Sequence, residues 1–125
     1  MEEKTERDEK GFRKLLVWQR AHELVLSIYK MTEKFPKSEM FGLTSQMRRA
    51  AVSISANIAE GQGAGTKPQF VRYLDIARGS LSEVEYYLVL SKDLQYMTPE
   101  KYKETEALRG EVGFLLYRLI LSMKK

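Results

Sequence analysis

The residues most suggestive of chemistry form one stretch, SQMRRAAVSISANIAEGQGAG at residues 45–65, which carries paired arginines, an asparagine and three glycines. With the two residues that follow, it ends in the loop GQGAGTK, which invites comparison with phosphate-binding loops. The Walker motif has the form Gly-x-x-x-x-Gly-Lys-Ser/Thr and follows a strand, whereas here three residues separate Gly61 from Gly65 and Thr66 precedes Lys67. The glycines also lack the spacing of a dinucleotide-binding fingerprint. We therefore interpret the loop as a helix cap and a flexible turn, with weak anion binding at the next helix start as the lesser alternative.

Catalytic and metal-binding side chains are scarce in this chain. His22 is the single histidine and there is no cysteine, so the usual zinc sites and a Cys/His nucleophile pair cannot be assembled. Asp75 lies three residues from both Arg72 and Arg78, which is the spacing of an ion pair on a helix surface. The Glu-x-x-His motif of di-metal helical bundles is absent from the sequence. The sequence thus predicts a protein that is not an enzyme and holds no cofactor and no metal.

Composition favours a single globular domain. Hydrophobic residues make up 43% of the 125-residue chain and charged residues 30%, values that are ordinary for a soluble domain with its own core. No apolar stretch approaches the roughly 20 residues of a membrane-spanning helix, and the lack of cysteine fits a reducing compartment, so we expect a cytoplasmic protein without a membrane partner. The mixed-charge residues 1–13 are expected to form a solvated tail, which leaves residues 14–125 as the domain. A net charge of +4 permits an acidic partner without requiring one.

Hydrophobic periodicity divides the domain into four helices and indicates no strand. Apolar residues recur at every third or fourth position in four segments, residues 14–34, 44–60, 67–92 and 99–123. Thr44, Thr66 and Thr98 are expected to cap the starts of the last three helices, and Gly61 is expected to end the second one in a left-handed conformation. Because short connections make neighbouring helices antiparallel, the predicted fold is an all-α, up-down four-helix bundle.

The second helix has a face of small residues opposite its core stripe, and this face predicts contact with another helix. Gly79, in the middle of the third helix, costs about 1 kcal/mol relative to alanine, which suggests that a backbone approaches it closely. Apolar patches beyond one buried stripe usually mark interfaces, although scattered exposed aromatics are the ordinary alternative. We therefore predict self-association, with the following interface or structural candidates: Arg49, Ser53, Ala56, Asn57, Glu60, Gly79, Tyr86 and Phe114.

Three blocks of the sequence resemble the 23S ribosomal RNA intervening-sequence proteins, a family of four-helix bundles. They are LLVWQRAHELVLSIY at residues 15–29, FGLTSQMRRAAVSISANIAEG at residues 41–61 and FVRYLDIARGSLSEVEYYL at residues 70–88, and the combination of RRAA with NIAEG is the most specific part. Ser55 stands where family members usually carry proline, so this helix is expected to be straighter than theirs. The resemblance implies a homo-oligomeric ring, usually a pentamer. A more distant relation that is similar in fold, the accessory protein of diversity-generating retroelements, binds nucleic acid and a reverse transcriptase, which implies both as partners.

Two functions of different class remain open. In the first, the protein is a non-enzymatic oligomer that binds RNA or DNA as an accessory scaffold, with Arg48, Lys67, Arg72 and Arg78 on phosphates. In the second, it is a purely structural or protein-interaction oligomer, and its arginines serve its own contacts. Successive helical residues point about 100° apart. We therefore predict that Arg48 faces a ligand, while Arg49 pairs with a carboxylate at a helix or subunit contact.

Overall fold

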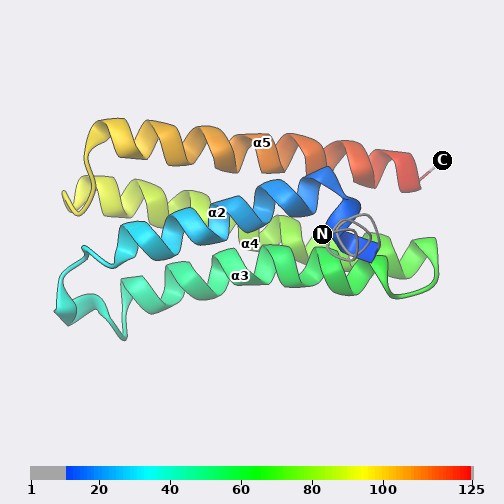
Figure 1. Cartoon of the computed structure of the whole chain (residues 1–125), viewed down its shortest axis with the longest axis horizontal. Helices are drawn as coiled ribbons and strands as arrows, with labels where there is room; N and C mark the ends of the chain where they lie inside the picture. The colour runs from blue at the N-terminus through cyan, green and yellow to red at the C-terminus, as the bar shows by residue number, and fades with distance from the viewer. Residues whose placement is uncertain (1–10, 125) are drawn as a thin grey trace, which may run out of the picture.

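Four α-helices form an antiparallel up-down bundle in the computed structural model, which describes residues 11–124 (Figure 1). They are α2 (Leu16–Thr32), α3 (Leu43–Gln62), α4 (Lys67–Asp93) and α5 (Pro99–Met123), and the 3-10 helices η1 (Gly11–Lys14) and η2 (Lys37–Glu39) precede α2 and α3. Each helix packs on its neighbour in the chain, and α5 closes the bundle against α2. No strand occurs between residues 11 and 124. The predicted fold class is confirmed, and so are the four helices.

The bundle has two unlike ends, which differ in the elements that they hold. The terminal end holds η1, the start of α2, the α3–α4 connection and the end of α5, on the right in Figure 1. The opposite end holds the α2–α3 and α4–α5 connections.

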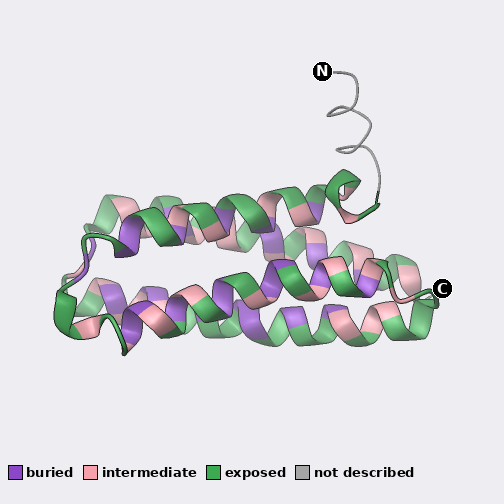
Figure 2. Ribbon diagram, turned by 60° about the horizontal axis from the view of Figure 1, so that its bottom comes forward, coloured by how far each residue is buried: buried purple, intermediate pink, exposed green. Residues whose placement is uncertain are grey.

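One buried stripe from each helix makes the core. Figure 2 shows these residues in purple on the inward sides of the helices, with exposed residues in green on the outer sides. Its largest fully buried apolar members are Leu24, Ile28, Met47, Ile54, Ile58, Leu74, Val84, Leu88, Val112 and Leu116. Each of them lies at the helical spacing that the sequence predicts, so the burial of apolar area accounts for how the four helices associate.

The prediction for Gly61 is wrong, because this glycine lies inside α3 and does not end it. The helix continues to Gln62, and Gly63, which follows it, has a φ of −87° rather than a left-handed conformation. Gly61 is buried, and a Cβ at this position would lie 2.8 Å from Cδ1 of Phe70 and 2.9 Å from Cβ of Tyr73. The missing side chain therefore lets α4 pack directly on the backbone of α3, which explains the glycine without any turn.

Two of the three predicted helix caps are confirmed. The hydroxyl of Thr66 accepts a hydrogen bond from the amide of Gln69 at 3.3 Å, and that of Thr98 accepts one from the amide of Lys101 at 3.1 Å. Thr44 is not a cap, because α3 already begins at Leu43 and the Thr44 side chain is buried. A carboxylate from η2 does the capping instead: Oε1 of Glu39 accepts the Leu43 amide at 3.1 Å.

The predicted tail at residues 1–13 lies mostly outside the described residues, but its last part differs from the prediction. Gly11–Lys14 form η1, which packs on α2 and α3. Gly11 has a φ of 61°, a left-handed conformation that favours glycine, and so it can turn the chain into this short helix. Phe12 is then held against Trp18, so Gly11–Lys14 are part of the described fold.

Candidate nucleic-acid interface

Three rings form a ladder on the outer surface of the terminal end. The rings of Phe12 and Trp18 lie 4.9 Å apart between centroids and are tilted by 59°. Trp18 and His22, one helical turn apart on α2, also lie 4.9 Å apart and are nearly parallel, at 8°. Together with Arg13 and Gln19, they line an open groove of about 550 Å³. We call Phe12, Trp18 and His22 the aromatic ladder.

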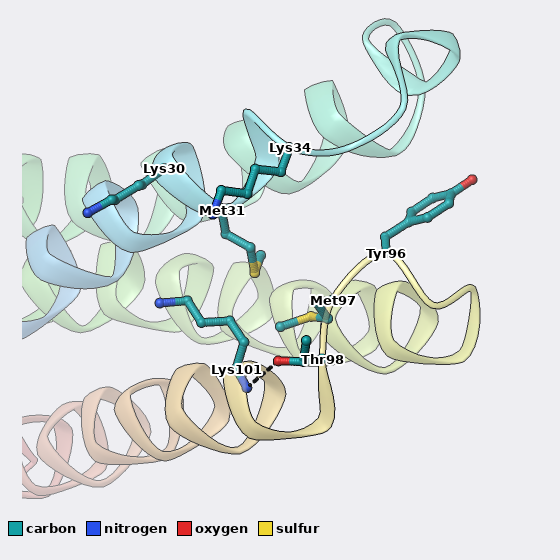
Figure 3. A pocket seen from close by; sticks show the side chains of 7 residues that line it. All are labelled: Lys30, Met31, Lys34, Tyr96, Met97, Thr98 and Lys101. Atoms are coloured by element: carbon teal, nitrogen blue, oxygen red, sulfur yellow. Dashed lines mark hydrogen bonds between the residues drawn. The ribbon is translucent and has the colours of Figure 1, made fainter.

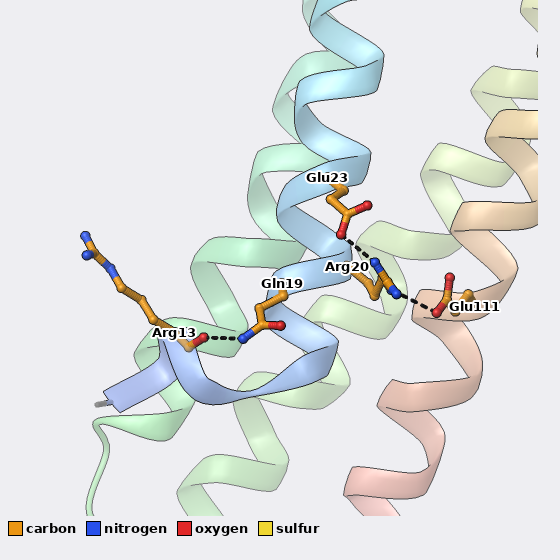
Figure 4. A network of polar contacts seen from close by, with 5 residues as sticks. All are labelled: Arg13, Gln19, Arg20, Glu23 and Glu111. Carbon is orange, nitrogen blue, oxygen red and sulfur yellow. Dashed lines mark hydrogen bonds and ion pairs between the residues drawn. The ribbon is translucent and has the colours of Figure 1, made fainter. Parts of the chain in front are cut away.

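Hydrogen bonds fix η1 beside α2, so the ladder has a defined geometry (Figure 4). The side-chain amide of Gln19 donates to the carbonyl of Arg13 at 2.7 Å, and the Leu15 amide donates to the carbonyl of Phe12 at 3.0 Å. These bonds occupy two carbonyl groups of η1 that would otherwise face solvent. Phe12 is therefore anchored through its own carbonyl and that of the next residue.

An ion-pair network holds α2 against α5 next to the ladder. The guanidinium of Arg20 lies 2.6 Å from the carboxylate of Glu23, on the same helix, and 2.9 Å from that of Glu111, on α5 (Figure 4). The hydrogen bonds to Glu23 and Glu111 raise the pKa of Arg20 above its usual value. One cation and two carboxylates give this cluster a net charge of −1, so Arg20 is a poor candidate for a phosphate contact.

Among the residues that the structure describes, basic ones outnumber acidic ones at the terminal end. Among residues 11–19, 57–73 and 114–124, the basic ones are Arg13, Lys14, Lys67, Arg72, Arg118 and Lys124, and the acidic one is Glu60. Lys67 and Arg72, both candidates from the sequence, are exposed at the start of α4. Positive charge and the aromatic ladder thus occur together at one end of the bundle. Sites that bind single-stranded nucleic acid use this combination.

The other two predicted phosphate contacts lie elsewhere. Arg78 is further along α4, with its guanidinium 3.8 Å from the carboxylate of Asp75. Arg48 lies between α2 and α3: its Nε donates to the Thr32 hydroxyl at 2.9 Å, and its guanidinium carbon is 4.6 Å from the centroid of the Tyr29 ring. The structure therefore does not gather the four candidate cations into one surface.

The two arginines of the pair differ in their contacts within residues 11–124, while their predicted roles at a ligand and at a subunit contact stay predictions. Arg48 has the structural contacts just described, whereas Arg49 is exposed and has no ion pair within residues 11–124. Arg49 does share a shallow groove of about 410 Å³ with Glu83 of α4, one of the carboxylates available to it. The two arginines differ because successive residues of α3 point in different directions: Arg48 points toward α2, and Arg49 points outward over the seam between α3 and α4.

Several interface candidates on α3 are engaged with α4 or with their own helix. The Asn57 amide donates to the carbonyl and the hydroxyl of Ser53, at 2.8 and 3.1 Å, and the Ser80 hydroxyl of α4 donates to Ser53 at 2.8 Å. This polar chain links the two helices at their seam. Ala56 and Glu60 remain exposed on the outer face of α3.

Gly79 has no close neighbour within the subunit. A Cβ at this position would meet nothing within 4 Å, so the predicted close approach is not made by another helix of the same bundle. On α5, by contrast, Gly113 does lie against another helix, because a Cβ at this position would lie 3.1 Å from Cδ2 of Leu81. Tyr86 and Phe114 are strongly exposed, at 60% and 59%, and their place at an interface stays a prediction.

The aromatic ladder was not predicted from the sequence. Trp18 fits the apolar period of its helix, and His22 is the single histidine of the chain, so neither residue suggested a stack by itself. The available signal was their spacing of four residues, which stacks side chains on one helix face. Phe12 could not be added from sequence, because its position depends on the turn at Gly11.

Two further classes of function find no support in the described part of the chain. Within residues 11–124, no helix is long and apolar enough to span a bilayer. The same residues contain no group of three or more His, Cys, Asp or Glu side chains placed to hold a metal ion.

Comparison with known proteins agrees with the fold and with the sequence blocks. The family model described as "23S rRNA-intervening sequence protein" matches residues 13–118. Among solved structures, a protein of unknown function from the S23 ribosomal protein family of Bacteroides thetaiotaomicron is similar, with a TM-score of 0.78 and 28% identity over 84% of this chain and 95% of that one. No curated protein matches the chain. The chain belongs to the 23S rRNA-intervening sequence protein family.

Proposed function

We propose that this protein is a non-catalytic, oligomeric scaffold that binds single-stranded nucleic acid at the terminal end of its bundle. The observation that carries the proposal is the aromatic ladder at an end where basic residues outnumber acidic ones. A base stacked on the outer face of His22 extends the ladder, and stacking on protein rings contributes about 1–3 kcal/mol per base. RNA is the first ligand to test, because the family name refers to ribosomal RNA.

Phosphate contacts supply the second part of the proposed affinity. Lys67 and Arg72 are exposed, and neither forms an ion pair within residues 11–124, so binding does not first require breaking one. Each neutralised phosphate releases counterions and makes the affinity more sensitive to salt. In a ring of subunits, several copies of these cations would act on one strand, and avidity would raise a modest affinity.

Self-association is supported by an apolar strip along the outer face of α5. Phe114, Tyr117 and Leu121 are 59%, 52% and 45% exposed and repeat at the spacing of one helix face. The exposed Gly110 continues the strip toward the start of the helix, where its missing side chain permits close approach. A second copy of the chain is the occupant we propose, and a ring of five is the arrangement that the family resemblance favours.

The test is the affinity for a labelled oligouridylate, measured by fluorescence anisotropy at low and at physiological salt. Replacing Lys67 and Arg72 together by glutamine should weaken binding and reduce the slope of log K against log salt by about 1–2. Arg78→Gln is the matched control, because Arg78 is also an exposed cation of α4 but lies near Asp75. Equal losses in both variants would contradict a site at the terminal end.

A structural or protein-interaction scaffold is the second candidate function. The observation that favours it is that Arg48, Ser53 and Asn57 all have partners within the subunit, so they serve packing rather than a ligand. Absence of oligouridylate binding at low salt, with an intact oligomer, would favour this function over the first.

A further inference from the structure

The opposite end of the bundle contains a pocket that none of the functions above uses. It lies between the end of α2 and the start of α5 and has a volume of about 340 Å³, which is within the range of small-molecule sites (Figure 3). Its lining consists of Lys30, Met31, Lys34, Tyr96, Met97, Thr98 and Lys101. We call it the methionine–lysine pocket.

The apolar part of the pocket is made by two thioether side chains. Met31 of α2 and Met97 of the α4–α5 connection are 7% and 8% exposed, and Figure 3 shows both pointing into the space between the helices. Methionine has a flexible and polarizable side chain, so it adapts to ligands of different shape. Such a surface suits an aromatic or aliphatic group of moderate size.

The polar part of the pocket carries an excess of positive charge. Lys30 lies in the last turn of α2, and Lys34 lies in the turn that follows the helix. Lys101 of α5 extends into the same space, and its ammonium lies 2.8 Å from the carboxylate of Glu104. Within residues 11–124, no carboxylate pairs with Lys30 or Lys34, so two of the three ammonium groups are uncompensated.

The start of α5 adds to this positive potential. Thr98 caps the helix, and the helix dipole places partial positive charge at its first turn, next to Lys101. The α2 end contributes the opposite partial charge, which offsets part of the repulsion between Lys30 and Lys34. The partial charges of the two helix ends do not neutralise the ammonium groups of Lys30 and Lys34.

We propose that the methionine–lysine pocket binds a small organic anion with an apolar body, the class to which aryl phosphates and aryl carboxylates belong. The apolar body packs on Met31 and Met97, and the anionic group faces the ammonium groups of Lys34 and Lys101, while Lys30 adds to the positive potential. This site is independent of nucleic-acid binding, because it lies at the other end of the bundle from the aromatic ladder.

The experiment uses phenyl phosphate as the probe and methionine-methyl NMR of the full chain as the readout. Because only six methionines are present, the Met31 and Met97 signals can be assigned by substitution. We expect saturable shifts of these two signals, with affinity at least about tenfold higher for phenyl phosphate than for phenol or inorganic phosphate, since each of these carries only half of the recognised chemistry.

Lysine variants decide whether the pocket recognises the charge. The double variant K30Q/K34Q should bind phenyl phosphate about three- to tenfold more weakly, since two exposed charges are lost. K103Q is the matched control, because Lys103 is an exposed lysine of α5 that does not line the pocket, and it should bind like the wild type. Unchanged binding in K30Q/K34Q, equal binding of phenol, or shifts confined to other methionines would each overturn the proposal.

Discussion

Gly61 and Gly79 should respond in opposite directions to the same substitution, although both are helical glycines. An alanine at 61 would place its Cβ 2.8 Å from Phe70 and 2.9 Å from Cβ of Tyr73, and the latter atom cannot move without its backbone. Overpacking of this kind costs about 1–3 kcal/mol, and alanine recovers about 1 kcal/mol of helix propensity. With two such contacts, we expect Gly61→Ala to lower the free energy of unfolding by about 1–2 kcal/mol.

Gly79→Ala is the matched control, because an added Cβ there meets nothing within 4 Å. It should raise the free energy of unfolding by about 0.5–1 kcal/mol through helix propensity alone. Urea unfolding at a fixed protein concentration measures both values, and the two variants should differ by about 1.5–3 kcal/mol. Equal stabilisation by both would refute the packing explanation of Gly61. A change of subunit mass in Gly79→Ala would instead place that glycine at a contact between copies.

Three further substitutions test single features of the structure. Ser55→Ala should raise the free energy of unfolding by about 1 kcal/mol in urea titrations, because the Ser55 hydroxyl is buried and has no hydrogen-bond partner among residues 11–124. Arg48→Ala should lower it by about 1–2 kcal/mol through loss of its contacts with α2. Arg49→Ala should stay within about 0.5 kcal/mol of wild type; equal effects would contradict the division of roles seen here. Phe114→Lys should reduce the mass measured by light scattering toward the 14.5 kDa of one chain, and an unchanged mass would exclude the α5 strip as the contact.

Periodicity was enough to predict the helices, but not how closely they approach. Apolar spacing identified each stripe, and threonine before proline-containing first turns identified the starts of α4 and α5. Gly61 was misread because a glycine near a helix end has two explanations, a left-handed cap or a close neighbour, and only the position of Phe70 distinguishes them. The start of α3 was misplaced for a similar reason, since Glu39 caps that helix from η2 across a turn that the local pattern does not specify.

The candidate site was less predictable than the fold. Lys67 and Arg72 could be identified as exposed cations because they lie off the core stripe of their helix. The ladder could not be identified, because it requires a short 3-10 helix to return along α2. The contacts of Arg48 could not be predicted either. The helical period places Arg48 to one side of the core stripe of α3, but it does not show that Thr32 and Tyr29 of α2 lie next to it.

Trp18 provides the most direct test of the proposed nucleic-acid site, because it is the only tryptophan of the chain and the central ring of the ladder. Tryptophan emission and the anisotropy of a labelled oligouridylate can be recorded in the same titration. If bases join the ladder, Trp18 emission should fall in parallel with the rise in anisotropy, and His22→Ala should weaken both changes together. A rise in anisotropy with unchanged Trp18 emission would show that nucleic acid binds elsewhere and would contradict the proposed site.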